Sequence, residues 1–435
     1  MDWTETHFGQ LVKGVRGVSF DPTDLLEHSG DNSVTLLRAN NIVGNQLKFE
    51  NTLSIPLKKV KKDQLMQTGD IAVCMSNGSK ALVGKSAQYN DEYKTALSVG
   101  AFCSIFKPQA NAVADFIPFL FQSHTYQKQI DISLSGSAIN NLKNSDIETI
   151  TFRIPSPKYQ NKIASILKTI DTAIHKTEVL IQKYQQIKQG LMHDLFTRGV
   201  TPNGKLRPTR EQIPELYKET SIGWIPREWK VNRIRSLCHP VTKGATPSKF
   251  VDHYDSENSV PFVRVENLTF DGSFKTEKSL LFVDKKVHDR ELMRSKIFPG
   301  DILMNIVGPP LGKVSFVPED FKEFNTNQAV AIFRTFSKKH RNFLLYYLLS
   351  DFSQRWFYVR SKQTSGQVNL TLEMCSDLEI PFPQNDREVE RISTAIYIVY
   401  QKLESEVSIY KKLQNQKSGL IHDLMTGKVR VTVDE

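Results

Sequence analysis

The stretch GLMHDL at residues 190–195 is repeated as GLIHDL at residues 419–424. Each copy closes a long run in which apolar residues alternate at steps of three and four, from Ile163 to Leu191 and from Val389 to Leu424. This heptad spacing predicts two long helices, each with one narrow apolar stripe. Because such a stripe needs a partner, we predict that the two helices pair with each other as an antiparallel coiled coil.

Further landmarks recur in the same order along the 435-residue chain. Their separations range from 226 residues, between Arg38 and Arg264, to 231 residues, between Gly69 and Gly300. The other matched landmarks are Lys13-Gly14 with Lys243-Gly244, Gly136 with Gly366, and Pro155 with Pro381. Solenoid repeats have periods of about 20 to 50 residues, so this longer period indicates a tandem of two domains.

Each repeat begins with a part that mixes short apolar runs with Gly, Asn and Pro turns, which is typical of strands. Helical stretches such as FIPFLFQSHTYQKQI and RNFLLYYLLSDFSQRWF interrupt these runs, so the predicted fold class is α+β. The predicted parts are a first globular domain at 1–158, a helical region at 159–198, a linker at 199–222, a second globular domain at 223–385, a C-terminal helical region at 386–427 and a tail at 428–435.

The composition narrows the classes of partner. The chain has 57 Lys and Arg against 47 Asp and Glu, a net charge of +10, which favours a polyanion. No signal peptide opens the chain and no run of about 18 apolar residues occurs, so we expect a cytoplasmic protein without a membrane segment. The four cysteines are far apart, form no CxxC pair and are expected to be buried free thiols: Cys74, Cys103, Cys238 and Cys375.

Motifs that suggest catalysis fail on spacing. The segment SNGSKALVGKS at 76–86 has five residues between Gly78 and Gly84, where a phosphate-binding P-loop needs four. The pairs His193-Asp194 and His422-Asp423 are neighbours in sequence, and neighbours do not face each other on a helix. A glycine-rich cofactor loop and a methyltransferase catalytic turn are absent from the sequence. We predict no catalytic residues, no metal ligands and no cofactor in this chain.

Side chains that can contact DNA phosphates or base edges occur at matched places in both repeats. The predicted DNA-binding residues are Lys13, Arg38, Lys85 and Asn140 in the first domain, and Lys243, Arg264, Lys313 and Asn369 in the second. Elsewhere the two domains differ: GVRGVSFDP in the first corresponds to GATPSKFVD in the second. Such differences are expected if one frame presents a different binding surface in each domain.

The order of a strand-rich domain, an SGSAINNL-like segment, an I-P-x-P turn and a heptad helix ending GL-[IM]-H-D-L resembles the specificity subunit of Type I restriction-modification enzymes. The linker, with its IGxIPxxW pattern from Ile222 to Trp229, is similar to that family's passage into the second domain. The first repeat departs from the family in having only Trp3 near its start, and the family's acidic L-P-x-x-E-Q tract appears here as IPSPKYQ and IPFPQND.

The resemblance implies two target recognition domains, a bipartite site on double-stranded DNA and a helix length that sets the gap between its halves. It also implies docking of two methyltransferase subunits and of restriction/translocase subunits. S-adenosylmethionine, ATP and Mg would belong to those partners. The alternatives are a coiled-coil scaffold that reads no DNA, for which the long helices alone would suffice, and a stand-alone DNA-modifying enzyme, which the absent catalytic loops oppose.

Overall fold

The computed structural model describes residues 3–28, 30–90, 93, 95–135, 140–251, 255, 257–275, 280–318, 320, 322–361 and 368–433. The landmarks Gly136 and Gly366 lie outside these residues. The chain divides into two compact units, unit 1 with residues 1–178 and 408–435 and unit 2 with residues 179–407. Among the described helices, none combines the length and the hydropathy that a membrane span requires.

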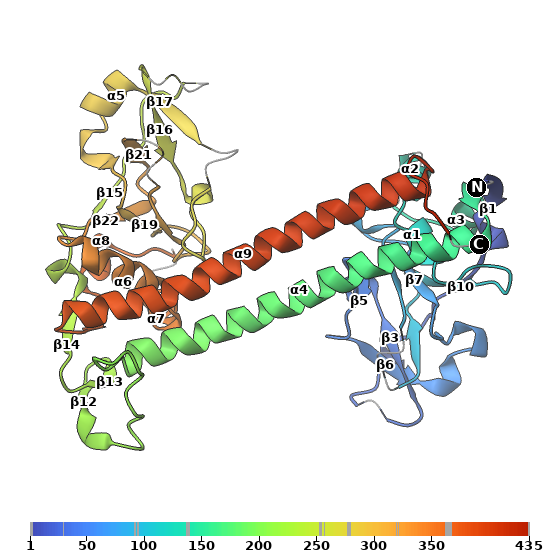
Figure 1. The fold of residues 1–435 in the computed structure, drawn as a ribbon, viewed down its shortest axis with the longest axis horizontal. Coiled ribbons are helices and arrows are strands. Elements are labelled where there is room, and N and C mark those ends of the chain that lie inside the picture. Colours follow the sequence, from blue (N-terminus) through green and yellow to red (C-terminus); the bar gives the residue numbers. More distant parts are fainter. Residues whose placement is uncertain are drawn as a thin grey trace. The chain divides into compact units, whose positions relative to one another are not determined.

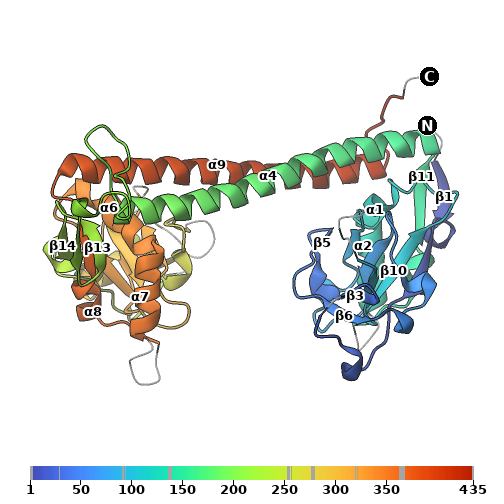
Figure 2. The same cartoon turned by 90° about the horizontal axis from the view of Figure 1, so that it is seen from below.

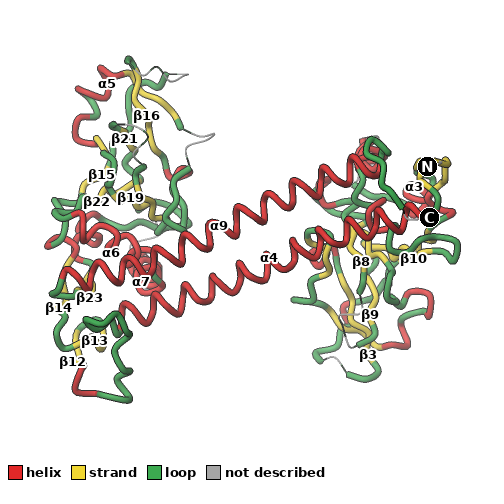
Figure 3. The backbone as a smooth tube through the Cα atoms, viewed as in Figure 1, coloured by secondary structure: helices red, strands yellow, loops and turns green. Residues whose placement is uncertain are grey.

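Unit 1 contains the first globular domain, which consists mostly of short strands and loops (Figure 3). Its strands are β1 (Trp3–His7), β2 (Val12–Arg16), β3 (Ser33–Leu37), β4 (Ile42–Val43), β5 (Gln46–Leu47), β6 (Leu53–Pro56), β7 (Ile71–Cys74), β8 (Ser86–Gln88), β9 (Leu97–Val99), β10 (Cys103–Pro108) and β11 (Thr151–Pro155). Its short helices are α1 (Ile117–Leu120), α2 (His124–Ser135) and α3 (Asn144–Glu148). The main sheets have the strand orders β2-β10-β7-β8 and β6-β3-β9, and β3 runs parallel to β9.

Unit 2 contains the second globular domain. Its strands are β12 (Tyr217–Thr220), β13 (Gly223–Pro226), β14 (Lys230–Arg233), β15 (Thr242–Lys243), β16 (Ser259–Val263), β17 (Leu281–Asp284), β18 (Lys296–Ile297), β19 (Ile302–Asn305), β20 (Val314–Phe316), β21 (Phe324–Thr326), β22 (Val330–Phe333) and β23 (Glu379–Phe382). Its short helices are α5 (Lys285–Arg290), α6 (Lys338–Leu349), α7 (Asp351–Ser361) and α8 (Leu372–Asp377). The strand order β15-β22-β19-β20 and the parallel pair of β16 with β21 repeat the topology of the first domain.

Two long helices, α4 (Pro157–Thr197) and α9 (Asp386–Met425), lie side by side (Figures 1 and 2). In unit 2 the Tyr184 ring lies 5.9 Å from the Lys402 ammonium, and the Lys188 ammonium lies 4.6 Å from the centroid of the Tyr400 ring. The partner number falls as the α4 number rises, so the helices are antiparallel. The predicted α+β fold with two paired long helices is therefore confirmed.

Residues that commonly begin or end helices set the limits of α4 and α9. Helix α4 begins with Pro157, whose missing N–H costs nothing in the first turn, and Gly199 follows its end in a left-handed conformation with φ of +63°. The Asn385 side chain precedes α9 and accepts a hydrogen bond of 2.9 Å from the Arg387 N–H, and Gly427, with φ of +71°, follows its end.

Both ends of each long helix are buried in a domain core. In unit 1, the core of the first domain includes side chains from the start of α4 and the end of α9: Ile163, Leu167, Ile421 and Leu424. In unit 2, the core of the second domain includes side chains from the end of α4 and the start of α9: Met192, Leu195, Phe196, Val389, Ile392 and Ile396. The helices are thus parts of the domain cores as well as partners of each other.

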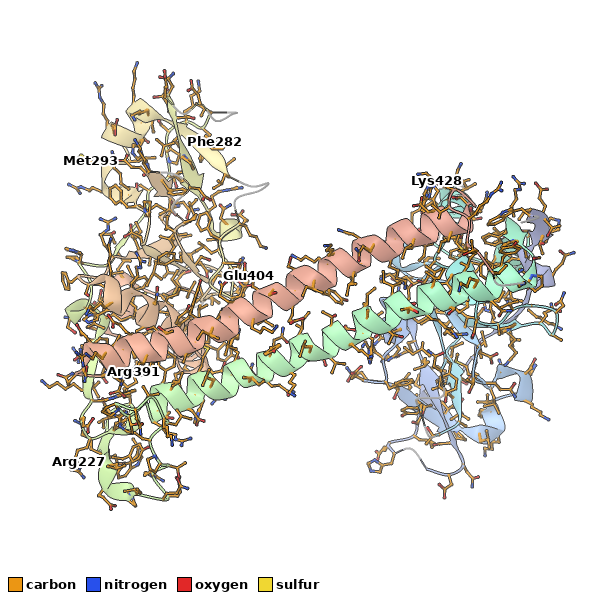
Figure 4. All side chains as sticks on the ribbon, in the orientation of Figure 1. Arg227, Phe282, Met293, Arg391, Glu404 and Lys428 are labelled. Atoms are coloured by element: carbon orange, nitrogen blue, oxygen red, sulfur yellow. The ribbon has the colours of Figure 1, made fainter. Side chains whose placement is uncertain are left out.

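The linker is fixed to unit 2 by a buried ion pair. The Arg207 guanidinium contacts both carboxylate oxygens of Glu388 at the start of α9, with an Nη2–Oε2 distance of 3.0 Å, and each side chain is 8% exposed. Arg227 donates to the carbonyls of Glu215 and Tyr217, and Arg391 donates to the carbonyl of Thr201 (Figure 4).

Neutralising one partner of this pair will destabilise unit 2. We expect Glu388→Gln to lower the free energy of unfolding by about 3 kcal/mol, because the buried Arg207 guanidinium would lose its buried partner and keep only the ion pair of 3.0 Å with Glu228, whose side chain is 77% exposed. Urea denaturation followed by circular dichroism measures the change. The control is Glu211→Gln, which removes an exposed ion pair with Arg210 of 3.8 Å and should leave the midpoint unchanged. Equal midpoints for the two variants would contradict the prediction.

Candidate nucleic-acid interface

One edge of the four-stranded sheet in the first domain gathers strand ends and turns. Strands β2 and β7 end there, and β10 and β8 begin there, because Arg16 pairs with Ser104 and Cys74 pairs with Cys103 across antiparallel ladders. The Cys74 N–H donates to the carbonyl of Lys85 over 2.9 Å, which places Lys85 beside the end of β7. We call this edge, with Arg16, Lys85 and the turn between β9 and β10, the strand-end edge.

The strand-end edge also holds Arg38. The Gly100 N–H donates to the carbonyl of Leu37 over 2.9 Å, so the residue after β3 lies against the turn between β9 and β10. The Arg38 side chain is exposed and donates to the carbonyl of Asn51 over 2.7 Å. Its backbone N–H donates to the Asn41 side chain, which caps the 3-10 turn Ala39–Asn41.

The second domain has the same edge, built from the end of β15, the starts of β22 and β20 and the end of β19. The Asn305 N–H donates to the carbonyl of Lys313 over 3.1 Å, as Cys74 does to Lys85. Arg264 precedes a 3-10 turn capped by Asn267, as Arg38 precedes one capped by Asn41. The Lys313 ammonium lies 3.3 Å from the carbonyl of Val265, so Lys313 and Arg264 are neighbours.

The structure brings together two of the predicted pairs as true equivalents. Lys85 and Lys313 both follow a glycine with positive φ, Gly84 at +84° and Gly312 at +80°. Glycine is favoured there because a Cβ would be strained by that backbone and would also meet the neighbouring helix, at Ile130 in the first domain. Hairpins with the same hydrogen bonds thus present a lysine at the same place in both domains.

The predicted equivalence of Lys13 and Lys243 is wrong by three residues. Lys243 pairs with Ala331 near the start of β22, whereas Lys13 pairs with Lys107 near the far end of β10. The residue that pairs at the start of β10 is Arg16. The matching glycine is Gly17, not Gly14, because Gly17 and Gly244 both lie directly against the end of a neighbouring strand, where a Cβ would collide with backbone carbonyls.

The predicted equivalence of Asn140 and Asn369 is wrong by one residue. Asn369 forms a β-bridge with Val307, and the corresponding bridge in the first domain joins Ser76 to Asn141. Asn140 is half-buried, and its side chain donates to the carbonyl of Gly78 over 3.2 Å. Asn141 is exposed beside the same hairpin. Asn140 therefore holds the loop, and Asn141 occupies the place of Asn369.

Comparison of the two repeats by residue identity missed Arg16 and Asn141, because the short turns differ in length between the two domains. The signal that could have found Arg16 is the glycine after it: Gly17 is followed by Val18, whose N–H donates to the carbonyl of Val99, and Gly244 is followed by Ala245, whose N–H donates to that of Thr326. A glycine that must fit against a strand end fixes the register better than a lysine on the surface.

The charge of the strand-end edge is positive. In the first domain the segments 38–41, 75–85, 100–103 and 140–143 carry Arg38, Lys80, Lys85 and Lys143 and no acidic residue. In the second domain the corresponding segments carry Arg264, Lys313 and one acidic residue, Glu266, which lies 3.6 Å from Arg264. Within the described residues the Lys85 ammonium has neither an ion pair nor a hydrogen bond, so it is free to contact a phosphate.

Other polar clusters have structural roles. The nearest nitrogen and oxygen of His193 and Asp194 are 4.0 Å apart, too far for a hydrogen bond, and His193 stacks on Phe352 instead.

His288, Asp289 and Glu323 could together offer three metal ligands. The Lys296 ammonium, however, lies 2.7 Å from Asp289 and 3.5 Å from Glu323 and balances their charge. The hydrogen bond from His288 lowers the pKa of Glu323, which favours the ionised form of this carboxylate. The four cysteines are buried free thiols, as predicted.

Comparison with known proteins agrees with the duplicated fold. The family described as Type I restriction modification DNA specificity domain matches this chain twice, over residues 2–188 and 226–415. The chain belongs to the Type I restriction-modification specificity subunit family. The two matched segments cover both repeats, including most of α4 and α9.

Individual relatives show the same relationship at lower identity. The specificity subunit of the EcoKI enzyme of Escherichia coli is 30% identical over 204 residues, which are 47% of this chain and 43% of that protein. The match thus spans less than half of that relative. The MjaVIII specificity subunit of Methanocaldococcus jannaschii is 21% identical over 99% of this chain and 93% of its own length. The S subunit structure from M. genitalium shares the fold, with a TM-score of 0.58, 13% identity and coverage of 97% and 96% of the two chains.

Arg16 and Lys13 lie at opposite ends of β2 and should differ in their contact with DNA. We expect Arg16→Gln to weaken binding to duplex DNA on all sequences and to reduce the slope of log affinity against log salt by about one, because one phosphate contact is lost. Lys13→Gln removes the same charge three residues away at the other end of β2 and should leave the slope unchanged. Fluorescence anisotropy across a salt series, with the partner methyltransferase present, measures both. A reduced slope for Lys13→Gln alone would overturn the assignment.

Proposed function

We propose that this chain is the noncatalytic DNA-recognition subunit of a Type I restriction-modification complex, and that each globular domain reads one half of a bipartite site on double-stranded DNA. The observation that carries the proposal is the strand-end edge, present in both domains with the same backbone hydrogen bonds and with cations at the same places. The segments that begin at the equivalent glycines Gly17 and Gly244 differ between the domains, GVSFDP against GATPSK. Two domains that share a backbone frame but carry different side chains can recognise two different half-sites.

The partners follow from the family. We infer that two methyltransferase subunits dock on the helical pair and that restriction/translocase subunits join them, in the cytoplasm where the DNA lies. The partners would supply S-adenosylmethionine, ATP and Mg, since this chain is proposed to hold none. In the same proposal residues 1–158 and 223–385 are the recognition domains, 159–198 and 386–427 the helical regions, 199–222 the linker and 428–435 the tail.

Methylome sequencing tests the proposed function. A host that expresses this chain with its cognate methyltransferase should carry methylated adenine or cytosine in a bipartite motif with a fixed unspecified gap. Exchange of residues 1–158 for the first domain of another family member should change one half of that motif only. A continuous motif, or no motif, would contradict the two-half-site proposal and favour a scaffold that reads no DNA.

The helical ends suggest where partners dock. Met192 and Leu195 of GLMHDL are buried, as are Ile421 and Leu424 of GLIHDL. Packing in the domain cores therefore explains why these positions are apolar. Packing does not account for Gly190 and Gly419. Both lie inside a helix with open space where a Cβ would point, although glycine there costs about 1 kcal/mol of helix stability relative to alanine. A partner's close approach would explain both glycines.

Bulky residues at these glycines should separate stability from assembly. We expect the double variant Gly190→Gln, Gly419→Gln to be at least as stable as the natural chain, because glutamine is the better helix former. The same variant should bind the methyltransferase at least tenfold more weakly, because the added side chains occupy the contact. The matched control is Gly190→Ala, Gly419→Ala, which gains helix stability with little added bulk. Thermal unfolding and size-exclusion chromatography with the methyltransferase measure the two properties; undiminished complex formation by the glutamine variant would rule out this docking site.

A further inference from the structure

The turn between β9 and β10 carries an aromatic side chain that the fold does not need. Phe102 is 69% exposed, more than any other large hydrophobic residue in the described part of the chain. The equivalent position in the second domain is Ala329, because the Met75 N–H donates to the Phe102 carbonyl and the Ile306 N–H donates to the Ala329 carbonyl, each over 2.8 Å. The same frame thus forms with alanine at this place.

The backbone of this turn is held from both sides. The Cys103 N–H donates to the Gly100 carbonyl over 2.8 Å and closes the turn, and the N–H groups of Met75 and Ser76 both donate to the Phe102 carbonyl. In the second domain the Val330 N–H closes the turn on Asn327 over 3.2 Å. A rigid turn presents its side chain in one direction, which is what selective contact with a ligand requires.

The side chains presented by the two turns differ in kind. The first turn reads Gly100-Ala101-Phe102 and the second Asn327-Gln328-Ala329. The first turn thus presents an apolar ring from its third residue, and the second presents an exposed amide from its second residue. The Gln328 side-chain oxygen accepts a hydrogen bond from Thr246. Its amide nitrogen has no hydrogen-bond partner within the described residues and can donate to a ligand.

The surroundings identify the ligand. Arg38 lies against the first turn through the Gly100–Leu37 hydrogen bond, and Lys85 lies across the end of β7 from it. Cations of this kind bind phosphates, whereas a phenylalanine cannot. An aromatic ring beside phosphate-binding groups suits the apolar edge or face of a base, and an amide suits the hydrogen-bonding edge of a base.

We propose that these two turns are the base-reading elements of the domains: Phe102 contacts the thymine methyl group or an unstacked base in one half-site, and Gln328 hydrogen-bonds to a base in the other. This inference rests on the proposed function. It adds the residues that make the two half-sites different on a common frame.

The test compares sequence preference with overall affinity. The complex of this chain with its methyltransferase is used to select from a duplex library with randomised half-sites. Phe102→Ala should reduce discrimination at one or two base pairs of one half-site by roughly tenfold, and Gln328→Ala should do the same in the other half-site only. Neither variant should change the salt dependence of binding, because neither removes a charge. Ala329 in the second domain shows that Phe102→Ala is compatible with the fold.

Phe336→Ala removes another aromatic that is 60% exposed, which follows β22 at the end away from the strand-end edge, and should leave both half-sites unchanged. If the natural complex selects a bipartite motif but Phe102→Ala and Gln328→Ala select the same one, the turns do not read bases, and the proposed function stands. Loss of methyltransferase binding by Phe102→Ala would assign the ring to a protein contact instead. If the natural complex selects no bipartite motif, the proposed function itself fails.

Discussion

Burial of the narrow apolar stripes on α4 and α9 is the constraint on which the rest of the structure depends. A helix of about 40 residues with one apolar stripe is not stable alone in water, because most helical stability in proteins comes from packing of the apolar face. Here the stripes meet each other, and their ends enter the domain cores. Ile163 and Leu167 lie in the same core as Ile421 and Leu424, and Leu195 and Phe196 lie in the same core as Val389 and Ile392. Neither domain core is complete without residues from both helices.

Polar residues also occupy some positions inside the apolar stripes of the two helices. Lys417 occupies a heptad position and its ammonium lies 2.5 Å from Asp171 of the facing helix. Glu406 occupies another, is only 6% exposed, and is held by Lys402 over 3.0 Å. Such residues contribute little to stability, but the Lys417–Asp171 pair joins the two helices and forms in one register and one direction only, as polar pairs in coiled-coil seams commonly do. The Lys402–Glu406 pair lies within α9 and does not depend on the register. The pair between Lys417 and Asp171 therefore helps to select the antiparallel register.

The sequence was sufficient for the helices, the duplication and the fold class, because these depend on periodicities that extend over tens of residues. It was insufficient for the candidate site, because surface cations carry no periodic signal. Arg38 and Lys85 were matched correctly to Arg264 and Lys313 since each adjoins a constrained residue, a buried capping asparagine or a glycine with positive φ. Lys13 adjoins Gly14, which has no positive φ and packs against the Asn144 side chain, and its match with Lys243 failed by three residues. The heptad prediction also erred locally: Ile187 is 41% exposed, and the Lys188 ammonium lies over the Tyr400 ring instead.

The two domains separate the residues that hold the frame from those that vary on it. Asn41 and Asn267 are buried and donate to loop carbonyls at the same places in the two domains. Asp70 and Asp301 each accept a hydrogen bond from a backbone N–H in the turn before the central strand. Each of these aspartates also forms an ion pair, Asp70 with Lys107 and Asp301 with Arg334. Loss of any of these would leave buried polar groups unpaired, which costs far more than a surface change. The side chains of the turn carry no such cost, since Phe102 and Ala329 occupy the same backbone position. A protein that must recognise two different half-sites with one fold can therefore change its preference at the turns while the buried asparagines and aspartates keep the edge in place.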